Sequence, residues 1–295
     1  MTSRLEIIER LRSHAKAVAA TPQLSSLPAQ PFLFCGPCQL ESRDHALRLA
    51  EQIKSTAIEH GFLPIFKASF DKANRTKSSS ARGVGLEQAK PIFTAIQQDL
   101  DIPTLSDIHL PEHPKQLEDV VDVLQIPAFL CRQTDLLIAA GESGKVINLK
   151  KGQFVHPTDL KYAAEKIAAA NSQSSVYLCE RGACFGYRDL VVDMRGLFQM
   201  RELGYPVVFD GSHVVQSMSG KDGVSGGNPI FTPPLCRAAV AVGIDALFIE
   251  THENPSSAPS DGDSMLPLTK LSPLLKTLRA LHSTVREALS GEGEQ

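Results

Sequence analysis

The stretch ALFIETH (246–252) is a short apolar run that ends on residues able to do chemistry. Continuous runs of this length, rich in β-branched and aromatic residues, suit parallel strands that are buried on both faces. Eight such runs with helical stretches between them predict an α/β fold, a (β/α)₈ barrel. The other seven are FLFCGPC (32–38), LPIFKAS (63–69), PTLSDIH (103–109), VDVLQI (121–126), VINLKK (146–151), VYLCER (176–181) and PVVFDGSH (206–213).

The active site of a TIM barrel lies where the strands end, so the strand-terminal residues are candidate active-site groups. Three loops at the same end, 71–85, 218–228 and 254–264, are longer than barrel connections need. Their length favours substrate contacts over tolerated surface insertions. The strand-terminal candidates are Cys38, Lys67, Asp107, Gln125, Lys151, Arg181, His213 and Glu250.

The segments between the runs have helical periodicity. Residues 46–58 present one apolar face, Ser42 is a candidate N-cap and Gly61 a stop signal. Further crossover helices are predicted at 111–120, 158–170, 190–203 and 233–242. With 295 residues and 42% hydrophobic composition, the chain is long and apolar enough for one large domain.

We expect this single domain to be a barrel at residues 31–285, preceded by an extension at 1–30 and followed by a flexible tail at 286–295. The extension lacks the apolar stretch of a secretory signal. Its apolar residues have the spacing of a surface amphipathic helix: Leu5, Ile8, Leu11 and Ala15.

The charge and the cysteines narrow the function classes. A net charge of −3 gives no general reason to expect nucleic-acid or membrane binding. The six cysteines, without an export signal, indicate reduced thiols and a cytoplasmic location. Cys131, Cys179 and Cys236 lie in apolar surroundings and are expected to be small core residues, whereas Cys184 is not placed.

Cations gather at the predicted rim despite the negative net charge. Lys67, Lys72, Arg75, Lys77 and Arg82 fall within one short segment, and Lys150, Lys151 and Arg181 end two later strands. A buried lysine is costly unless it meets an anion, and arginine can grip phosphate or carboxylate with two hydrogen bonds. Alternation along the strand predicts that one lysine of the 150–151 pair faces the barrel mouth. Ion pairing on a solvated loop and a Schiff-base lysine remain alternatives.

Four residues could converge as metal ligands, because strands one, seven and eight are neighbours in a closed barrel. Cys38, His213, Glu250 and Asp261 offer a thiolate, an imidazole and two carboxylates, a set suited to Zn²⁺, Fe²⁺ or Mn²⁺. The tetrad CGPC (35–38) could instead be a redox pair or half of a structural zinc site. The rivals for the same roles are His109, His252, Asp107 and Asp263.

Five segments resemble the 3-deoxy-D-manno-octulosonate 8-phosphate synthases, with no gap in motif order from about residue 31 to 285. This resemblance implies a (β/α)₈ barrel that condenses phosphoenolpyruvate with D-arabinose 5-phosphate and releases inorganic phosphate. It also implies a role in the biosynthesis of the lipopolysaccharide sugar KDO. The segments are FKASFDKANR (66–75), DVVDVLQIPAFLCRQTDLL (119–137), VINLKKGQF (146–154), ERGACFGYRDLVVDM (180–194) and AVAVGIDALFIETHENP (239–255).

The resemblance also implies residue roles. Lys67, Lys151 and Arg181 would hold phosphoenolpyruvate, with Lys72 between the two substrates. The sugar phosphate would contact Asn74, Arg75 and Thr76. Since relatives are homotetramers, Arg132 would reach the active site of a neighbouring subunit. The residues lining the mouth would be Asp107, His109 and Gln125, and the catalytic set would be Lys72, Asn74, His213 and Asp261.

The family has two classes that differ at the position of Cys38, where metal-independent members have Asn. The cysteine therefore implies a metal-dependent enzyme with one divalent ion per subunit, held by Cys38, His213, Glu250 and Asp261. Relatives usually read Thr-His where this chain has Gly211-Ser212-His213, so the local backbone is in question. Two other functions stay open: the related heptulosonate-phosphate synthase that uses erythrose 4-phosphate, and a non-catalytic sugar-phosphate-binding protein. The KANR (72–75) and LKKGQF (149–154) segments argue against the first.

Overall fold

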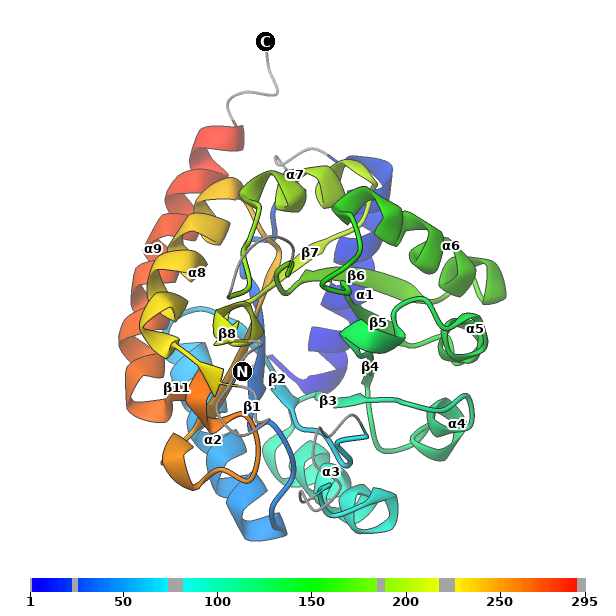
Figure 1. Cartoon of the computed structure of the whole chain (residues 1–295), viewed down its shortest axis with the longest axis vertical. Helices are drawn as coiled ribbons and strands as arrows, with labels where there is room; N and C mark the ends of the chain where they lie inside the picture. Colours follow the sequence, from blue (N-terminus) through cyan, green and yellow to red (C-terminus); the bar gives the residue numbers. More distant parts are fainter. Residues whose placement is uncertain (1, 23–25, 74–81, 185–188, 218–225, 291–295) are drawn as a thin grey trace.

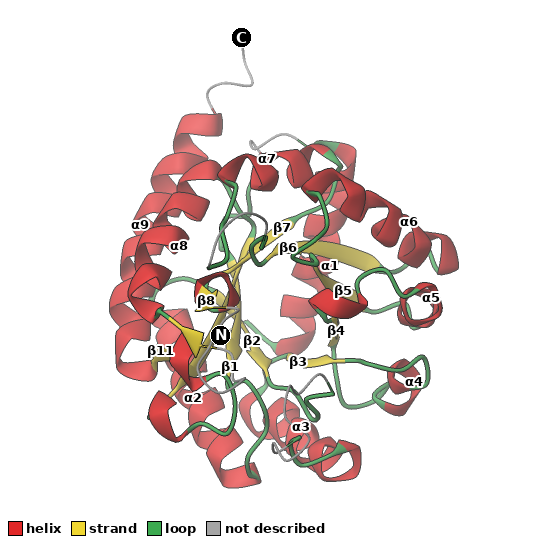
Figure 2. Cartoon of the chain, viewed as in Figure 1, coloured by secondary structure: helices red, strands yellow, loops and turns green. Residues whose placement is uncertain are grey.

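The computed structural model describes residues 2–22, 26–73, 82–184, 189–217 and 226–290. Eight parallel strands lie at its centre, ringed by helices (Figures 1 and 2). All eight predicted strands are confirmed: β1 (Phe32–Gly36), β2 (Leu63–Lys67), β3 (Thr104–Asp107), β4 (Val123–Ile126), β5 (Val146–Lys150), β6 (Ser175–Glu180), β7 (Val207–Asp210) and β10 (Ala246–His252).

The strands pair in chain order, and β1 pairs with β10 to close the barrel. In that last pairing Gly36 stands opposite Glu250, which brings the chain just after β1 beside the end of β10. Two short additions lie beyond the barrel strands. Strand β8 (Gln216–Ser217) pairs antiparallel with β9 (Gly226–Gly227), and β11 (Leu266–Pro267) pairs with the end of β10.

The helices cover the outside of the barrel, and α9 lies along α8. Helix α4 is a single turn, so the connection from the third strand to the fourth is short. Helix α7 begins only at Met194. Asp193 caps it by accepting a hydrogen bond from the Arg195 N–H. The helices are α1 (Arg4–Ala20), α2 (Arg43–Glu59), α3 (Leu86–Leu100), α4 (His113–Gln116), α5 (Thr134–Glu142), α6 (Leu160–Ala170), α7 (Met194–Glu202), α8 (Thr232–Val242) and α9 (Leu271–Ser290).

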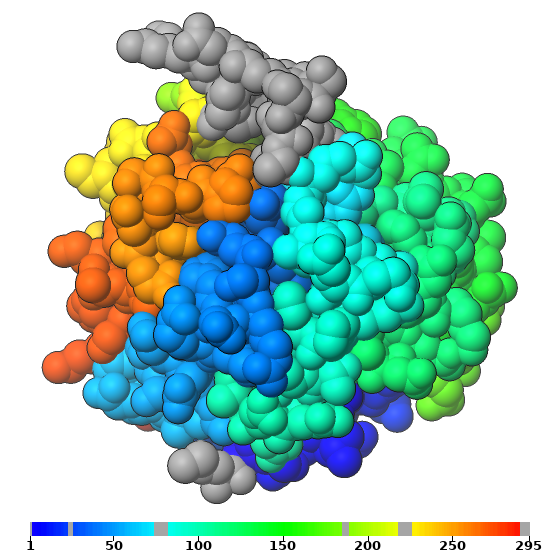
Figure 3. Space-filling view, turned by 90° about the horizontal axis from the view of Figure 1, so that it is seen from below, coloured from blue at the N-terminus to red at the C-terminus, as the bar shows by residue number. Residues whose placement is uncertain are grey.

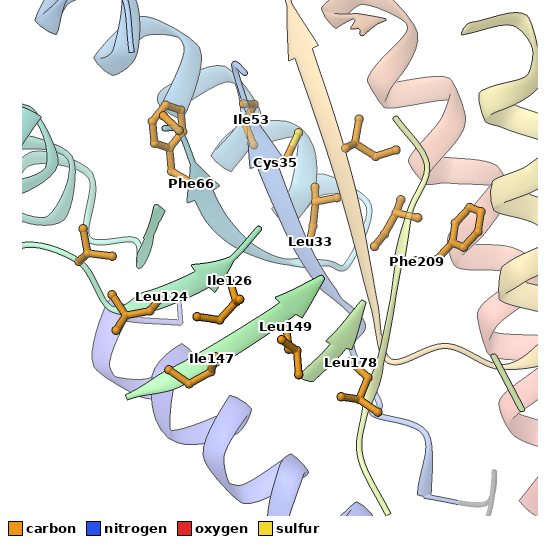
Figure 4. Close-up of a cluster of buried hydrophobic side chains, with 14 of the residues drawn as sticks. Leu33, Cys35, Ile53, Phe66, Leu124, Ile126, Ile147, Leu149, Leu178 and Phe209 are labelled. Atoms are coloured by element: carbon orange, nitrogen blue, oxygen red, sulfur yellow. The ribbon is translucent and has the colours of Figure 1, made fainter. Parts of the chain in front are cut away.

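The apolar core has two layers because strand side chains alternate in direction. One layer fills the space between strands and helices, and Figure 4 shows part of it, with side chains such as Leu33, Phe66 and Leu149 pointing outward from the strands. The other fills the barrel interior and includes Phe34, Tyr177 and Phe248. The three cysteines expected in the core, Cys131, Cys179 and Cys236, are buried with free thiols.

The N-terminal helix differs from its prediction as a surface helix. Its buried residues are Ile7, Leu11, Ala15 and Val18, while Leu5 is 71% exposed. Ile7, Leu11 and Ala15 join the interior layer, and the Tyr177 hydroxyl donates to the Leu11 carbonyl at 2.9 Å. Helix α1 therefore closes the N-terminal end of the barrel and belongs to the core.

At the other end of the chain, α9 continues to Ser290, five residues into the segment expected to be a tail from 286. No helix in the described part of the chain is both long enough and apolar enough to cross a bilayer.

Candidate active site

A cavity of ≈ 1050 Å³ opens at the C-terminal end of the barrel strands. Its wall combines the ends of seven strands with the loops that follow them, the arrangement expected of a barrel active site. Both anionic and cationic groups face it. The charged and amide side chains on this wall that matter for the chemistry are Lys67, Lys72, Asp107, Gln125, Lys150, Arg181, Asp210, His213, Gln216, Glu250 and Asp261.

The four predicted metal ligands come together at one side of this cavity. Ligand atoms of Cys38, Glu250 and Asp261 all lie within 4.8 Å of one another. The Cys38 sulfur is 2.9 Å from Asp261 Oδ2, and His213 Nε2 is 3.6 Å from Glu250 Oε2. Asp261 reaches the cluster from the loop after β10 with φ of 52°, a left-handed conformation that aspartate tolerates better than most residues.

The donor set suits a divalent transition metal. Glu250 is fully buried, and its Oε2 atom has no hydrogen-bond partner within the described residues. Burial raises the pKa of the Cys38 thiol, and the Asp261 and Glu250 carboxylates raise it further. A bound cation reverses this order, because a coordinating thiol is deprotonated outright. One buried thiol, one imidazole and two carboxylates therefore fit Zn²⁺, Fe²⁺ or Mn²⁺.

Cations lie beside the candidate ligands. Lys67 is buried, forms an ion pair with Glu250 and donates to the Cys38 carbonyl at 2.9 Å. Lys72 donates to Ser69 Oγ at 2.9 Å; burial opposes its charge, but nearby anions, Cys38 and Glu250 foremost, raise its pKa. Arg181 donates through Nη2 to Gln216 at 2.6 Å, and its Nη1 is buried with no partner in the described chain. An anion in the cavity would satisfy that atom.

The two lysines at the end of β5 point to different places. Lys150 lines the cavity, with Nζ paired to Asp210 and lying 3.2 Å from the centroid of the Phe248 ring. Lys151 is outside the cavity wall and donates to the Gly182 carbonyl at 3.2 Å, with Glu180 at 3.4 Å. Because neighbouring strand residues point to opposite faces, only one of the two can enter the mouth. The structure places Lys150 there and Lys151 outside the cavity wall, whereas the resemblance implied Lys151 as the substrate contact.

The middle of the cavity floor is a hydrogen-bonded chain across four strands. Asp107 accepts from both Ser69 and Gln125, and Asn148 donates to Gln125 Oε1 at 2.7 Å. Burial alone would raise the pKa of Asp107, but Lys72 and Lys67 lower it below its usual range. Asp107 thus stays an anion that orients its neighbours. His109 also lines the cavity, and burial lowers its pKa.

Three residues that sequence analysis did not select support the candidate ligands. Asp210 contacts both Lys150 and His213, and Gln216 donates to Asp261 Oδ1 at 3.2 Å. Ser212 accepts from the Glu250 backbone N–H at 2.6 Å. Asp210 could have been found from the sequence, since it ends strand β7 as the other candidates end theirs.

Close packing requires a glycine at position 211, two residues before His213. A Cβ atom on Gly211 would lie 2.5 Å from the Cys236 sulfur and 2.8 Å from Ile249 Cδ1, so a side chain there would force the core apart. Ser212 is fully buried, and its hydroxyl oxygen accepts a hydrogen bond from the Glu250 backbone N–H. This bond joins the residues after β7 to β10. The departure from the family pattern therefore leaves His213 in place.

Several rival and predicted residues do not join the site. His252 Nδ1 accepts from the Asn254 N–H at 2.9 Å, so its Nε2 carries the proton and donates to Glu41 at 2.9 Å. This bond and the 2.9 Å contact between His45 and Glu253 join the end of β10 and the residue after it to the first turn of α2 and the segment before it (orange beside blue in Figure 3). His252 therefore groups with Glu41 and His45, apart from Cys38, Glu250 and Asp261. Asp263 lines the cavity but is not in the ligand group.

The remaining predicted contacts lie away from the wall or outside the described residues. Arg132 is exposed and is not part of the cavity wall. Asn74, Arg75, Thr76 and Lys77 fall outside the described residues. Cys35 packs between strands and helices while Cys38 is at the rim, and both thiols are free, which does not favour a redox pair.

Comparisons with known proteins place this geometry in context. The family model described as "DAHP synthetase I family" matches residues 28–287. A "2-dehydro-3-deoxyphosphooctonate aldolase" of Chelativorans sp. (strain BNC1) is 51% identical over 248 residues, 84% of this chain and 90% of the relative. Proteins of the same name from Cyanothece sp. (strain PCC 7425 / ATCC 29141) and Bradyrhizobium diazoefficiens are each 50% identical, over 91% and 86% of this chain and 98% and 90% of theirs.

Proposed function

The chain belongs to the DAHP synthetase I family, among its 2-dehydro-3-deoxyphosphooctonate aldolases, and we propose from this premise that it makes 3-deoxy-D-manno-octulosonate 8-phosphate. It is a transferase that condenses phosphoenolpyruvate with D-arabinose 5-phosphate and releases inorganic phosphate. The product supplies the KDO sugar of lipopolysaccharide.

The observation that carries the substrate assignment is the group of buried cations in the cavity. Lys67, Lys150 and Arg181 are each at most 6% exposed, and Arg181 Nη1 has no partner in the described chain. Buried cations at a cavity wall are stable only beside anions, and a guanidinium matches phosphate and carboxylate geometry. Phosphoenolpyruvate carries both groups on three carbons, so one small molecule can engage all three side chains.

The reaction needs a field that stabilises charge as it shifts. The enol carbon of phosphoenolpyruvate attacks the sugar aldehyde, water adds to the carbon that bears phosphate, and phosphate leaves by carbon–oxygen cleavage. Lys67, Lys150 and Arg181 are fixed before reaction and offset the phosphate charge throughout. Lys72 lines the same cavity, and because nearby acidic groups raise its pKa it keeps its proton for hydrogen bonding.

We propose that one divalent ion per subunit is held by Cys38, His213, Glu250 and Asp261. When bound, such an ion supplies Lewis-acid chemistry that orients the aldehyde. His213 and Asp261 lie beside the reacting centre and steer protons there. The orphaned Glu250 oxygen and the short contact between Cys38 and Asp261 support this assignment.

The sugar phosphate would take the other end of the cavity, toward Asp71, Arg82 and His109. We propose that Asn74, Arg75 and Thr76 complete its site. A homotetramer in which Arg132 reaches a neighbouring active site is supported by exposed aromatic side chains nearby, since Phe129 is 52% and Phe154 48% exposed. A cytoplasmic location is supported by free thiols at every cysteine of the chain.

A coupled assay of phosphate release tests the function. Arabinose 5-phosphate with phosphoenolpyruvate should give turnover, and erythrose 4-phosphate should be a poor substitute. Preference for erythrose 4-phosphate would assign the heptulosonate-phosphate reaction instead. Calorimetric binding of both substrates without turnover, in protein loaded with metal, would identify a non-catalytic relative.

A further inference from the structure

Asp210 sits at the junction of the metal-ligand group and the substrate cations. It ends strand β7, is fully buried, and touches four donors. Its Oδ1 accepts from the backbone N–H groups of Ser212 at 3.1 Å and His213 at 2.9 Å. Its Oδ2 faces His213 Nδ1 at 2.7 Å and is paired with Lys150. Both carboxylate oxygens are thus occupied by protein donors, and Asp210 is not itself placed as a ligand.

The contact at Nδ1 decides what the other nitrogen of His213 can do. A carboxylate accepts hydrogen bonds, so the proton of the neutral imidazole lies on Nδ1. The lone pair is then on Nε2, the atom that lies 3.6 Å from Glu250 Oε2. A histidine that binds a metal commonly donates its other N–H to a carboxylate, which fixes both the tautomer and the ring orientation.

We propose that Asp210 is a positioning residue that holds His213 in the Nδ1–H form, with Nε2 aimed at the metal position, while Lys150 balances its buried charge. The inference rests on the proposed function, because it concerns the metal that the enzyme would bind. The two backbone bonds to Oδ1 fix the carboxylate itself, so the imidazole is oriented by a rigid group.

The test is Asp210→Asn. If the amide oxygen keeps the two backbone bonds, the amide nitrogen faces His213 and Lys150 as a donor. His213 then accepts at Nδ1 and carries its proton on Nε2, the nitrogen needed for the metal. We expect Zn²⁺ affinity, measured by competition with a chromophoric chelator, to fall about 10- to 100-fold.

Asp245→Asn is a matched control. Asp245 is also fully buried, lies 2.7 Å from a histidine nitrogen (His14), and is paired with Arg201 at the opposite end of the barrel. It should lower the melting temperature and leave Zn²⁺ affinity unchanged. Equal Zn²⁺ affinity in Asp210→Asn and wild type would overturn the proposal, as would an equal loss in both variants.

The Michaelis constant for phosphoenolpyruvate separates positioning from general damage. Asp210→Asn removes an anion beside Lys150, so at saturating Zn²⁺ this constant should stay the same or fall. A rise would show that the pocket itself has been disrupted and would count against the proposal.

A measurement on the wild type covers the case in which Asp210→Asn does not fold. The chain has nine histidines, so ¹⁵N-labelled side chains can be followed by NMR in Zn²⁺-loaded protein, with His213→Gln assigning the signal. A proton on Nδ1 is expected, and a proton on Nε2 would refute the inference. Failure of wild-type protein to bind Zn²⁺ would count against the metal assignment under the proposed function instead.

Discussion

The two adjacent lysines at the end of β5 offer a sharp test of the site, because Lys150 faces the cavity whereas the resemblance implied a substrate role for Lys151. Lys150 points into the cavity, whereas Lys151 points away from it to the Gly182 carbonyl. Replacement of each by methionine keeps an unbranched side chain, one atom shorter, and removes the charge. Both changes leave a buried carboxylate behind, Asp210 in one case and Glu180 in the other. The cost in folding free energy is therefore comparable, about 3–5 kcal/mol each.

The effects on catalysis should differ. Loss of one charge-assisted hydrogen bond to phosphoenolpyruvate costs about 1.5–3 kcal/mol. At 1.4 kcal/mol per factor of ten, Lys150→Met should lower kcat/KM for this substrate about 10- to 150-fold. Lys151→Met should leave kcat/KM unchanged, since its Nζ bonds only to protein groups in the described chain.

Phosphate release, measured below the melting temperature of both variants, compares the two directly. A loss of activity confined to Lys151→Met would refute the placement of the two side chains and restore the role that the resemblance implied. Equal losses would show that stability, not substrate contact, governs the result.

Three further predictions concern the proposed metal and the pH dependence of folding stability. Cys38→Asn replaces the thiol by a neutral amide, so protein purified without chelator should lose its bound metal while circular dichroism stays unchanged; full metal content would exclude Cys38 as a ligand. Exhaustive chelation of the wild type should abolish turnover, and Zn²⁺, Fe²⁺ or Mn²⁺ should restore it; activity that survives would rule out an essential metal. Burial lowers the pKa of His282 to about 4, so the unfolded state takes up a proton first as pH falls below about 6.5. Stability should then decline between about pH 6.5 and 4 by up to roughly 3 kcal/mol relative to His282→Leu in urea unfolding; parallel curves would contradict this.

The barrel could be predicted from sequence because its signal is local. Each strand is a continuous apolar run, and the residue that ends it is fixed by the same run. The convergence of the candidate metal ligands also followed from the barrel closure, which makes the first and last strands neighbours. These inferences needed only the order of elements, and Gly36 stands opposite Glu250 as closure requires.

The sequence could not decide which residues of an element face inward. Alternation says that one of Lys150 and Lys151 faces inward, but only the pairing of β5 with β6 sets which one. In α1, two overlapping apolar stripes have helical spacing, one through Leu5 and Ile8 and one through Ile7 and Leu11. The open end of the barrel selects the second, because Ile7 and Leu11 fill its interior and Leu5 stays in solvent.

The arrangement of charged side chains at the site follows from one energetic condition: a buried charged group needs a partner of opposite charge. In the structure each candidate ligand carboxylate or imidazole is joined to a cation of the cavity, directly or through one residue. If Cys38, His213, Glu250 and Asp261 held a divalent ion, as proposed, the carboxylates would bind these cations less strongly, and the cations would be available to an anionic substrate. Under the proposed function, binding of the metal would therefore strengthen binding of the anion, and by linkage the anion would strengthen binding of the metal. The three connections are Lys67–Glu250, Lys150–Asp210–His213 and Arg181–Gln216–Asp261.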